Sequence, residues 1–108
     1  AEKQAFYFKF AEAATDIDAA RFLVHRAAWL DDQGERHTIE TAKAKIFATE
    51  AMLKAVDLAV TVHGGFGCTK RHPVERFYRD AKIWSFAQGT PEIMKLIIAR
   101  DLFNMKLI

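Results

Sequence analysis

Two short segments of this 108-residue sequence carry residue types that suit ligand binding, and both interrupt apolar stretches. The first is His63-Gly64-Gly65-Phe66-Gly67, in which three of four consecutive positions are glycine. Glycine lets a ligand come close to backbone N–H groups, as nucleotide sites require. The same composition is also typical of a sharp turn between two helices. The residues alone favour the turn and leave a nucleotide site as the alternative.

The second segment is Gln88-Gly89-Thr90-Pro91, which is followed by Glu92. A threonine before a proline and an acid is typical of a helix start, with a cap, a first-turn proline and a first-turn carboxylate. The N-terminus of a helix can also bind an anion. Because every capped helix has such an end, this segment is either a binding position or a plain helix start.

Other kinds of site are disfavoured by residue spacing. Di-iron helical bundles use Glu-x-x-His pairs, but no glutamate stands three residues before any of the four histidines, so we expect no metal site. The run from Gly64 to Lys70 is not a phosphate loop, because its lysine follows a threonine and no strand precedes it.

These segments must be positioned by helices, since apolar residues recur at helical spacing along the chain. The pattern predicts a first long helix that ends near Gly34 and a second that runs from Thr38 to the glycine segment. It predicts Pro73 as the first residue of a third helix and Thr90 as the cap of a fourth. Short connections make neighbouring helices antiparallel, so the expected fold is an all-α, up-and-down four-helix bundle.

The composition excludes several classes of protein. The net charge of +2 comes from 16 basic and 14 acidic side chains that are interspersed, unlike the concentrated basic surface of a nucleic-acid binder. No apolar run approaches the roughly 20 residues that span a bilayer, so we expect no membrane segment. A single cysteine, Cys68, cannot form an internal disulfide and suits a reducing compartment. Residues 1–10 already read as helix, so we expect a fragment of a longer protein.

Along nearly its whole length the chain resembles the C-terminal all-helical domain of the acyl-CoA dehydrogenase family of flavoenzymes. The resemblance rests on several separate motifs in the family's order and spacing. They are Ile17-Asp18-Ala19-Ala20-Arg21, His25-Arg26-Ala27-Ala28, His63-Gly64-Gly65-Phe66-Gly67, Pro73-Val74-Glu75-Arg76, Arg79-Asp80-Ala81-Lys82-Ile83, Gly89-Thr90-Pro91-Glu92-Ile93 and Ile98-Ala99-Arg100.

The resemblance implies FAD as cofactor and an acyl-CoA thioester as substrate. These enzymes are usually tetramers with FAD between subunits. The family positions that contact FAD correspond to Gln4 in the first helix, to the glycine-turn residues and to the start of the last helix, and the glycine turn meets the adenine-nucleotide half of a partner's FAD. Gly89 and Arg100 match positions against the acyl-CoA. The implied FAD contacts are Gln4, Thr61, Val62, His63, Gly64, Gly65, Thr90, Pro91 and Glu92. Thr61 departs from the family, where glutamine is common.

Gln88 stands where many members carry the glutamate that removes the α-proton of the thioester. A neutral amide cannot accept that proton, although it can form hydrogen bonds. Three explanations stay open. The base lies on an earlier helix outside these residues, or the parent protein runs another flavin reaction, or the base is lost. We favour the first.

The resemblance therefore implies that residues 1–108 are the C-terminal domain of a flavin-dependent acyl-CoA dehydrogenase. The domain would be inactive alone, because the family's N-terminal helical and central β-domains are absent. The implied partners are further copies of the chain, as homodimer or homotetramer, and an electron-transfer flavoprotein. The expected compartment is the bacterial cytoplasm, with the mitochondrial matrix as alternative. Two other functions remain: a non-catalytic helical oligomerisation module, and a family-like flavoprotein with a different reaction. We expect the isolated domain to lose FAD and to self-associate through Phe6, Phe8, Phe103 and Leu107.

Overall fold

The structure, a computed structural model, describes residues 2–106 and contains four α-helices and no strand within that range. The bounds of the elements in chain order are α1 Glu2–Asp32, α2 Thr38–His63, the short 3-10 helix η1 Gly64–Cys68, α3 Val74–Trp84 and α4 Pro91–Leu102. The predicted all-α, four-helix fold is confirmed, with breaks at the three predicted positions.

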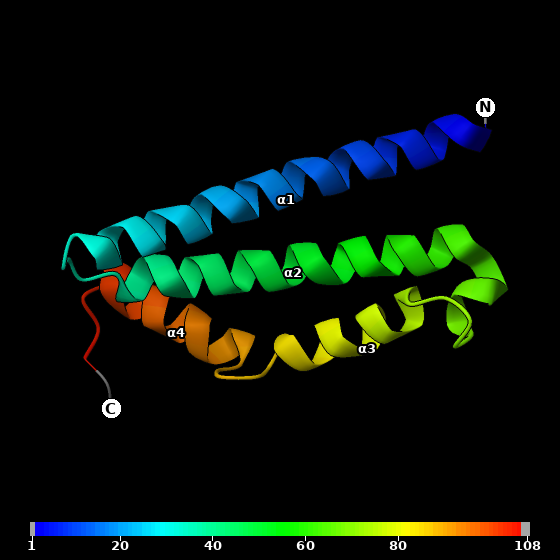
Figure 1. Ribbon diagram of the computed structural model, residues 1–108. Helices are drawn as coiled ribbons and strands as arrows, with labels where there is room; N and C mark the ends of the chain where they lie inside the picture. Colours follow the sequence, from blue (N-terminus) through cyan, green and yellow to red (C-terminus); the bar gives the residue numbers. More distant parts are fainter. Residues whose placement is uncertain (1, 107–108) are drawn as a thin grey trace.

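Helix α2 is the centre of the molecule. It packs against α1 on one side and against α3 and α4 on the other, and within residues 2–106 α1 contacts no other helix. As Figure 1 shows, α1 and α2 run antiparallel, and α3 and α4 return along α2 end to end. The chain thus runs up along α1, down along α2 and up again along α3 and α4, which together form a third rod. The glycine turn lies where α2 meets this rod, and residues 85–90 form the break inside it.

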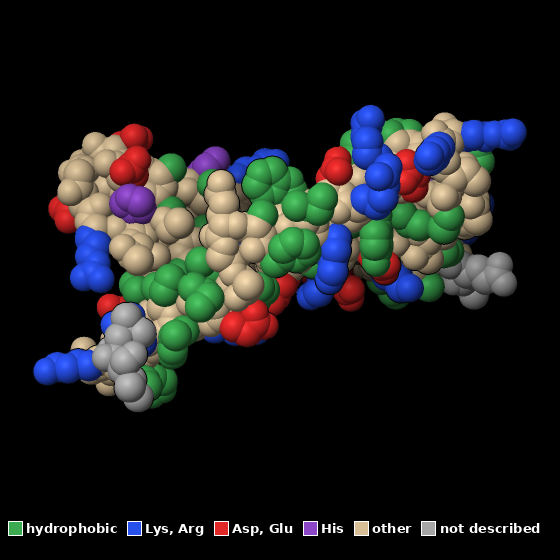
Figure 2. Space-filling view, turned by 90° about the horizontal axis from the view of Figure 1, so that it is seen from below, with side chains coloured by type: hydrophobic (Ala, Val, Ile, Leu, Met, Phe, Trp, Pro, Cys, Tyr) green, Lys and Arg blue, Asp and Glu red, His purple; other side chains and the backbone are tan. Residues whose placement is uncertain are grey.

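The interior consists mainly of alanine, which lets α1 and α2 approach closely. The buried side chains are Ala20, Ala27, Ala42, Ala44, Ala51, Leu58, Val74 and Ala81. Many large apolar side chains remain exposed instead, among them Phe22, Trp29 and Phe103. Figure 2 shows apolar side chains in patches between charged ones on the face seen from the α3 and α4 side. The chain therefore buries little of its aromatic surface by itself.

Two local expectations need correction. Pro73 is not the first helical residue: its carbonyl accepts the N–H of Phe77 at 3.1 Å, and it precedes α3 as the N-cap. Helical spacing also predicts ion pairs of Glu75 with Arg79 and of Arg76 with Asp80. The first forms, with Arg79 Nε 2.9 Å from Glu75 Oε2. The second does not form among the described residues, because the Arg76 guanidinium lies over the Phe77 ring, 5.6 Å from its centroid.

The structure describes three of the four residues expected to drive self-association. Phe6, Phe8 and Phe103 are exposed, as expected, whereas Leu107 lies outside the described residues. None of the helices in residues 2–106 is long and apolar enough to cross a bilayer.

Candidate functional site

The glycines of the turn at the end of α2 differ in how closely they are packed. Gly67 is buried, and a Cβ there would lie 2.8 Å from the carbonyl oxygen of Val60 and 2.9 Å from the Cβ of His63. Gly67 is therefore required by packing. At Gly64 and Gly65, by contrast, no heavy atom lies within 4 Å of an added Cβ. The exposed backbone of these two residues leaves room for a ligand.

Gly64 has a further reason to be glycine. Its φ is 62° and its ψ is −148°, a conformation that side-chain-bearing residues rarely adopt. Its N–H donates to the carbonyl of Thr61, so the last turn of α2 is closed before the chain turns away. Thr61, Val62 and His63, the other predicted contacts of this segment, are exposed in that last turn.

A pair of histidines closes the turn, and sequence reasoning missed it. The rings of His63 and His72 have centroids 4.1 Å apart and are tilted by 38°. His63 Nδ1 lies 2.7 Å from the Ala59 carbonyl oxygen and must donate, because a carbonyl only accepts. His72 Nδ1 accepts the N–H of Val74 at 3.3 Å. The signal available in the sequence was only that two histidines flank the glycine segment.

The second predicted segment has an unusual backbone. Gln88 has φ 57° and Gly89 has φ 118°. Glycine is favoured at residue 89 by this conformation, whereas the one side chain that an added Cβ would meet, Met94, is flexible at its end and can move away. Gln88, which the resemblance aligns with the family's glutamate, is exposed. The structure thus holds a neutral amide side chain, in a left-handed backbone conformation, three residues before the start of α4.

The start of α4 agrees with the sequence-based prediction of a capped helix. The Thr90 Oγ1 accepts the N–H of Ile93 at 3.4 Å, and Pro91 occupies the first turn. Hydrogen bonds from its own backbone N–H and from the Thr90 hydroxyl lower the pKa of Glu92. This helix end therefore presents a carboxylate that stays ionised, which suits hydroxyl and N–H donors better than phosphate.

Lys45 of α2, which sequence reasoning also missed, reaches this segment. Its half-buried side chain donates a hydrogen bond from Nζ to the carbonyl of Ala87. The two residues are 42 positions apart, so only the packing of α2 against the third rod brings them together. The one available signal was a lysine within the otherwise apolar stretch Ala44–Ala48.

Arg100, predicted to lie against acyl-CoA, is in the last turn of α4. Its Nε is buried and has no hydrogen-bond partner among the described residues. An unpartnered buried donor is costly, so this guanidinium is suited to an acceptor from another molecule or domain. It lines a polar depression with Arg36, Thr38, Ile39, Ile97, Asp101, Asn104 and Met105.

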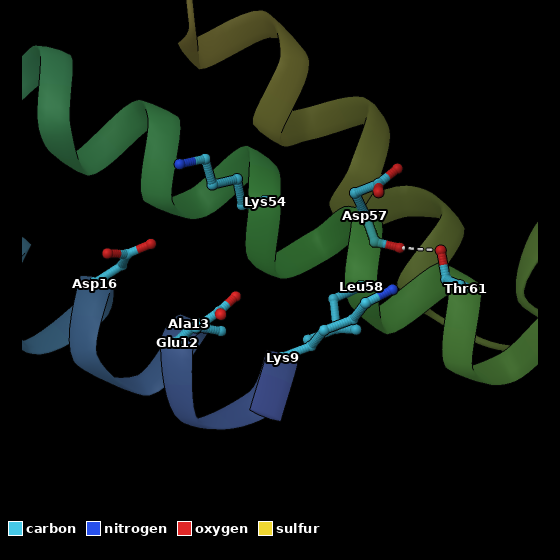
Figure 3. Close-up of a pocket in the computed structure, with 8 residues that line it drawn as sticks. All are labelled: Lys9, Glu12, Ala13, Asp16, Lys54, Asp57, Leu58 and Thr61. Carbon is cyan, nitrogen blue, oxygen red and sulfur yellow. Dashed lines mark hydrogen bonds between the residues drawn. The ribbon is translucent and has the colours of Figure 1, made fainter. Parts of the chain in front are cut away.

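A cleft between α1 and α2 contains only one of the predicted residues, Thr61. Figure 3 shows the lining residues Lys9, Glu12, Ala13, Asp16, Lys54, Asp57, Leu58 and Thr61. The Thr61 hydroxyl donates to the carbonyl oxygen of Asp57 at 2.8 Å. Three carboxylates against two ammonium groups make this cleft a poor site for phosphate. Within residues 2–106, no three His, Cys, Asp or Glu side chains are grouped to hold a metal ion.

The predicted residues do not converge on one pocket. The first turns of α1, with Gln4, and the glycine turn are at the same end of the molecule (Figure 1). Residues 88–92 are at the far end of α3, whose 11 residues alone account for about 16 Å of separation. Arg100 lies further along α4. One chain therefore presents the predicted residues on separate surfaces and not in a single pocket.

Comparison with known proteins gives concordant matches. The sequence profile described as "Acyl-CoA dehydrogenase, C-terminal domain" matches residues 1–103. Probable acyl-CoA dehydrogenase YngJ of Bacillus subtilis is 48% identical over 101 residues, which are 94% of this chain and 27% of that protein. Acryloyl-CoA reductase (NADH) of Anaerotignum propionicum is 44% identical over 104 residues, which are 96% of this chain and 26% of that protein. The structure of butyryl-CoA dehydrogenase from Megasphaera elsdenii matches with a TM-score of 0.90 at 35% identity, over 93% of this chain and 26% of that chain.

The chain spans about a quarter of the length of these relatives. The matched range, residues 1–103, includes every predicted site residue from Gln4 to Arg100. The resemblance inferred from the motifs is thereby confirmed. The chain belongs to the acyl-CoA dehydrogenase family, in the part described as its C-terminal domain.

Proposed function

We propose that residues 1–108 form the C-terminal domain of a flavin-dependent acyl-CoA dehydrogenase whose N-terminal helical and central β-domains lie outside this chain. The parent enzyme introduces a double bond between the α- and β-carbons of an acyl-CoA thioester. FAD, when bound, supplies the acceptor for the hydride that leaves the β-carbon. The observation that carries this proposal is the family match over residues 1–103. The domain contributes FAD and subunit contacts and is inactive alone.

The glycine turn fits the nucleotide half of FAD. The open space beside Gly64 and Gly65 allows a ring or a sugar to approach the exposed backbone. The last turn of α2 presents Thr61, Val62 and His63 beside it. Gln4 lies at the same end of the molecule, in the first turn of α1, where its amide can form hydrogen bonds with the cofactor.

The start of α4 fits a different part of the cofactor. Thr90 and the ionised Glu92 accept hydrogen bonds, so they suit uncharged hydroxyl or N–H groups. The family resemblance implies that FAD lies between subunits of a homodimer or homotetramer, so that the two segments of one chain contact two cofactors, and their separation by α3 is compatible with this arrangement. Gly89 and Arg100 lie against the acyl-CoA, and Arg100 has an unpartnered Nε to offer.

The presence of Gln88 favours a catalytic base elsewhere in the parent enzyme. The exposed amide cannot accept the α-proton, so a carboxylate on an earlier helix outside this chain carries out that step. A different flavin reaction is the alternative. One relative at 44% identity is named as a reductase. Bleaching of the flavin by an acyl-CoA therefore also tests the direction of the reaction.

The parent passes its electrons to a redox partner, for which an electron-transfer flavoprotein is the expected candidate. We place the parent in a bacterial cytoplasm and not in a mitochondrial matrix, because the relatives named above are bacterial proteins. Reoxidation of the reduced parent by purified electron-transfer flavoprotein, followed at 450 nm, tests the partner directly.

The proposed function is tested on the full-length parent. Purified protein is expected to keep FAD through desalting and to lose its 450 nm absorbance when mixed anaerobically with one member of a panel of acyl-CoAs. The isolated 108-residue domain, treated with excess FAD and desalted, is expected to be colourless. A parent that holds FAD but is bleached by no thioester would refute the dehydrogenase and leave another flavin reaction.

A non-catalytic oligomerisation module is the second candidate, because α1 presents aromatic side chains that remain exposed in the described part of the chain. Phe8, Phe22 and Trp29 are 60%, 73% and 58% exposed. Such a surface is suited to contact with other domains or copies. A full-length parent that assembles normally but binds no FAD would favour this function.

A further inference from the structure

The bond between Lys45 and Ala87 differs from the other side-chain hydrogen bonds among the described residues. Each of the others joins residues at most four positions apart in the chain. The Lys45 side chain instead crosses from α2 to the break between α3 and α4. Within residues 2–106 its ammonium group forms no ion pair. A half-buried charge therefore has a single backbone carbonyl as its protein partner.

This carbonyl belongs to the same peptide group as the N–H of Gln88. Because a peptide group is planar, fixing the direction of the Ala87 carbonyl also fixes the direction of the Gln88 N–H. The Gln88 N–H donates to no acceptor among the described residues, so it remains free for a ligand. Lys45 thus controls the orientation of a free donor at the position of the family's catalytic residue.

The backbone after this peptide needs such support. Gln88 has φ 57°, a conformation that costs free energy for a residue other than glycine and persists only where the surroundings hold it. On its C-terminal side the Gln88-Gly89 link is held by Thr90, whose hydroxyl caps α4. Lys45 holds the N-terminal side. The Gln88-Gly89 link is therefore fixed from both ends, once by a local cap and once by a distant helix.

A purely structural role does not account well for the choice of lysine. Partial burial of an ammonium group costs desolvation free energy, and one hydrogen bond to a neutral carbonyl does no more than offset that cost. A methionine would fill the same space without it. What lysine adds is a directed positive charge, which holds the peptide group and polarises it. Resting on the function proposed above, we propose that Lys45 is a positioning residue that orients the Ala87–Gln88 peptide for the reaction of the parent enzyme.

The test uses the full-length parent and three variants. Lys45→Met removes the donor and keeps the length of the side chain, Lys45→Arg restores a charged donor, and Lys43→Met is a matched control at an exposed position of the same helix. We expect Lys45→Met to lower kcat for flavin reduction about 10- to 100-fold, the usual effect of losing a hydrogen bond to a charged group, with KM changed less than about threefold. Lys45→Arg is expected to recover most of the loss, and Lys43→Met to stay within about twofold of the parent.

Hydrogen–deuterium exchange of the segment 85–90 gives a second readout that does not require turnover. The N–H of Ala87 bonds the Ile83 carbonyl at 3.0 Å, so release of the link is expected to speed its exchange in Lys45→Met and not in Lys43→Met. Unchanged exchange, or a kcat for Lys45→Met within twofold of the parent, overturns the positioning role. If no thioester bleaches the unaltered parent, the proposed function fails, and the exchange result alone decides whether Lys45 holds this peptide. If Lys45→Met does not fold, Lys45→Gln takes its place in both measurements.

Discussion

Replacing Gly67 by alanine tests the packing of the glycine turn, with Gly65→Ala as its matched control. The added Cβ at residue 67 would lie 2.8 Å from the Val60 carbonyl oxygen and 2.9 Å from His63 Cβ. Neither atom is the end of a flexible side chain, so the end of α2 must shift to relieve the overlap. Overpacking of this kind costs about 1–3 kcal/mol of unfolding free energy.

For a domain of this size each kcal/mol lowers the melting temperature by about 4–8 °C, so we expect Gly67→Ala to melt at least about 4 °C below the unaltered chain. Gly65→Ala meets no atom within 4 Å and should leave stability within about 1 kcal/mol, because alanine also restricts the unfolded chain. Circular dichroism at 222 nm during a thermal ramp measures both. Equal melting temperatures for the two variants would show that the turn is looser than its contacts imply.

The same pair of glycines separates stability from cofactor binding. In the full-length parent, Gly65→Ala places a methyl group in the space proposed for FAD and is expected to weaken FAD retention without lowering the melting temperature of the apoprotein. Gly67→Ala is expected to lower the melting temperature of the apoprotein but to retain FAD at a temperature where the variant is folded. If Gly65→Ala keeps its FAD at the parent's affinity, the nucleotide does not approach this backbone.

Three further outcomes are expected. Thr90→Ala removes the α4 cap and should cost about 1 kcal/mol, read from urea unfolding. Because hydrogen bonding lowers the folded-state pKa of Glu92, its contribution is present above the unfolded pKa and is lost as pH falls through the folded pKa, so the effect of Thr90→Ala should shrink in acid. In the full-length parent, Gln88→Ala should slow flavin reduction only about 5- to 150-fold, the effect of losing a positioning amide. A base elsewhere would be contradicted if Gln88→Ala abolished flavin reduction while Gln88→Glu left α-proton exchange in deuterated water unchanged. The isolated domain should self-associate in light scattering through its exposed apolar side chains, and a clean monomer at high concentration would argue against this.

Most helix boundaries were predictable because they depend on chemistry within a few residues, and the start of α3 differs by one residue from the prediction at Pro73. Gly34, with φ 70°, ends the first helical stretch as expected of a left-handed glycine, and its N–H bonds the Asp31 carbonyl at 2.9 Å. Thr90 and Pro91 begin α4 in the predicted positions. These residues act on their immediate neighbours, so the sequence order alone carries the information.

The parts of the site that escaped prediction depend on the path of the chain in space. Lys45 reaches Ala87 only because the third rod returns along α2 at a particular register. The rings of His63 and His72 meet only because the intervening turn folds back on itself. Arg76 was expected to pair with Asp80, but a neighbouring aromatic ring competes for its guanidinium. Helical periodicity describes spacing along one element, and it does not say which distant atom faces a side chain.

Helix α2 connects both segments that we propose to bind ligands, and this continuous helix sets the distance between them. The glycine turn follows directly from its last residue, His63, and the Gln88-Gly89 link is tied to it through Lys45. From Lys45 to His63 the helix rises about 27 Å, so the two attachment points are set by a continuous helix and not by the flexible length of the turns between them. Around α2 the interior is mostly alanine, and large apolar side chains remain exposed on the outer faces of α1 and of the third rod. The self-association expected of the isolated domain and the two cofactor contacts proposed for the parent enzyme therefore draw on the same architecture, a central α2 with exposed apolar faces around it.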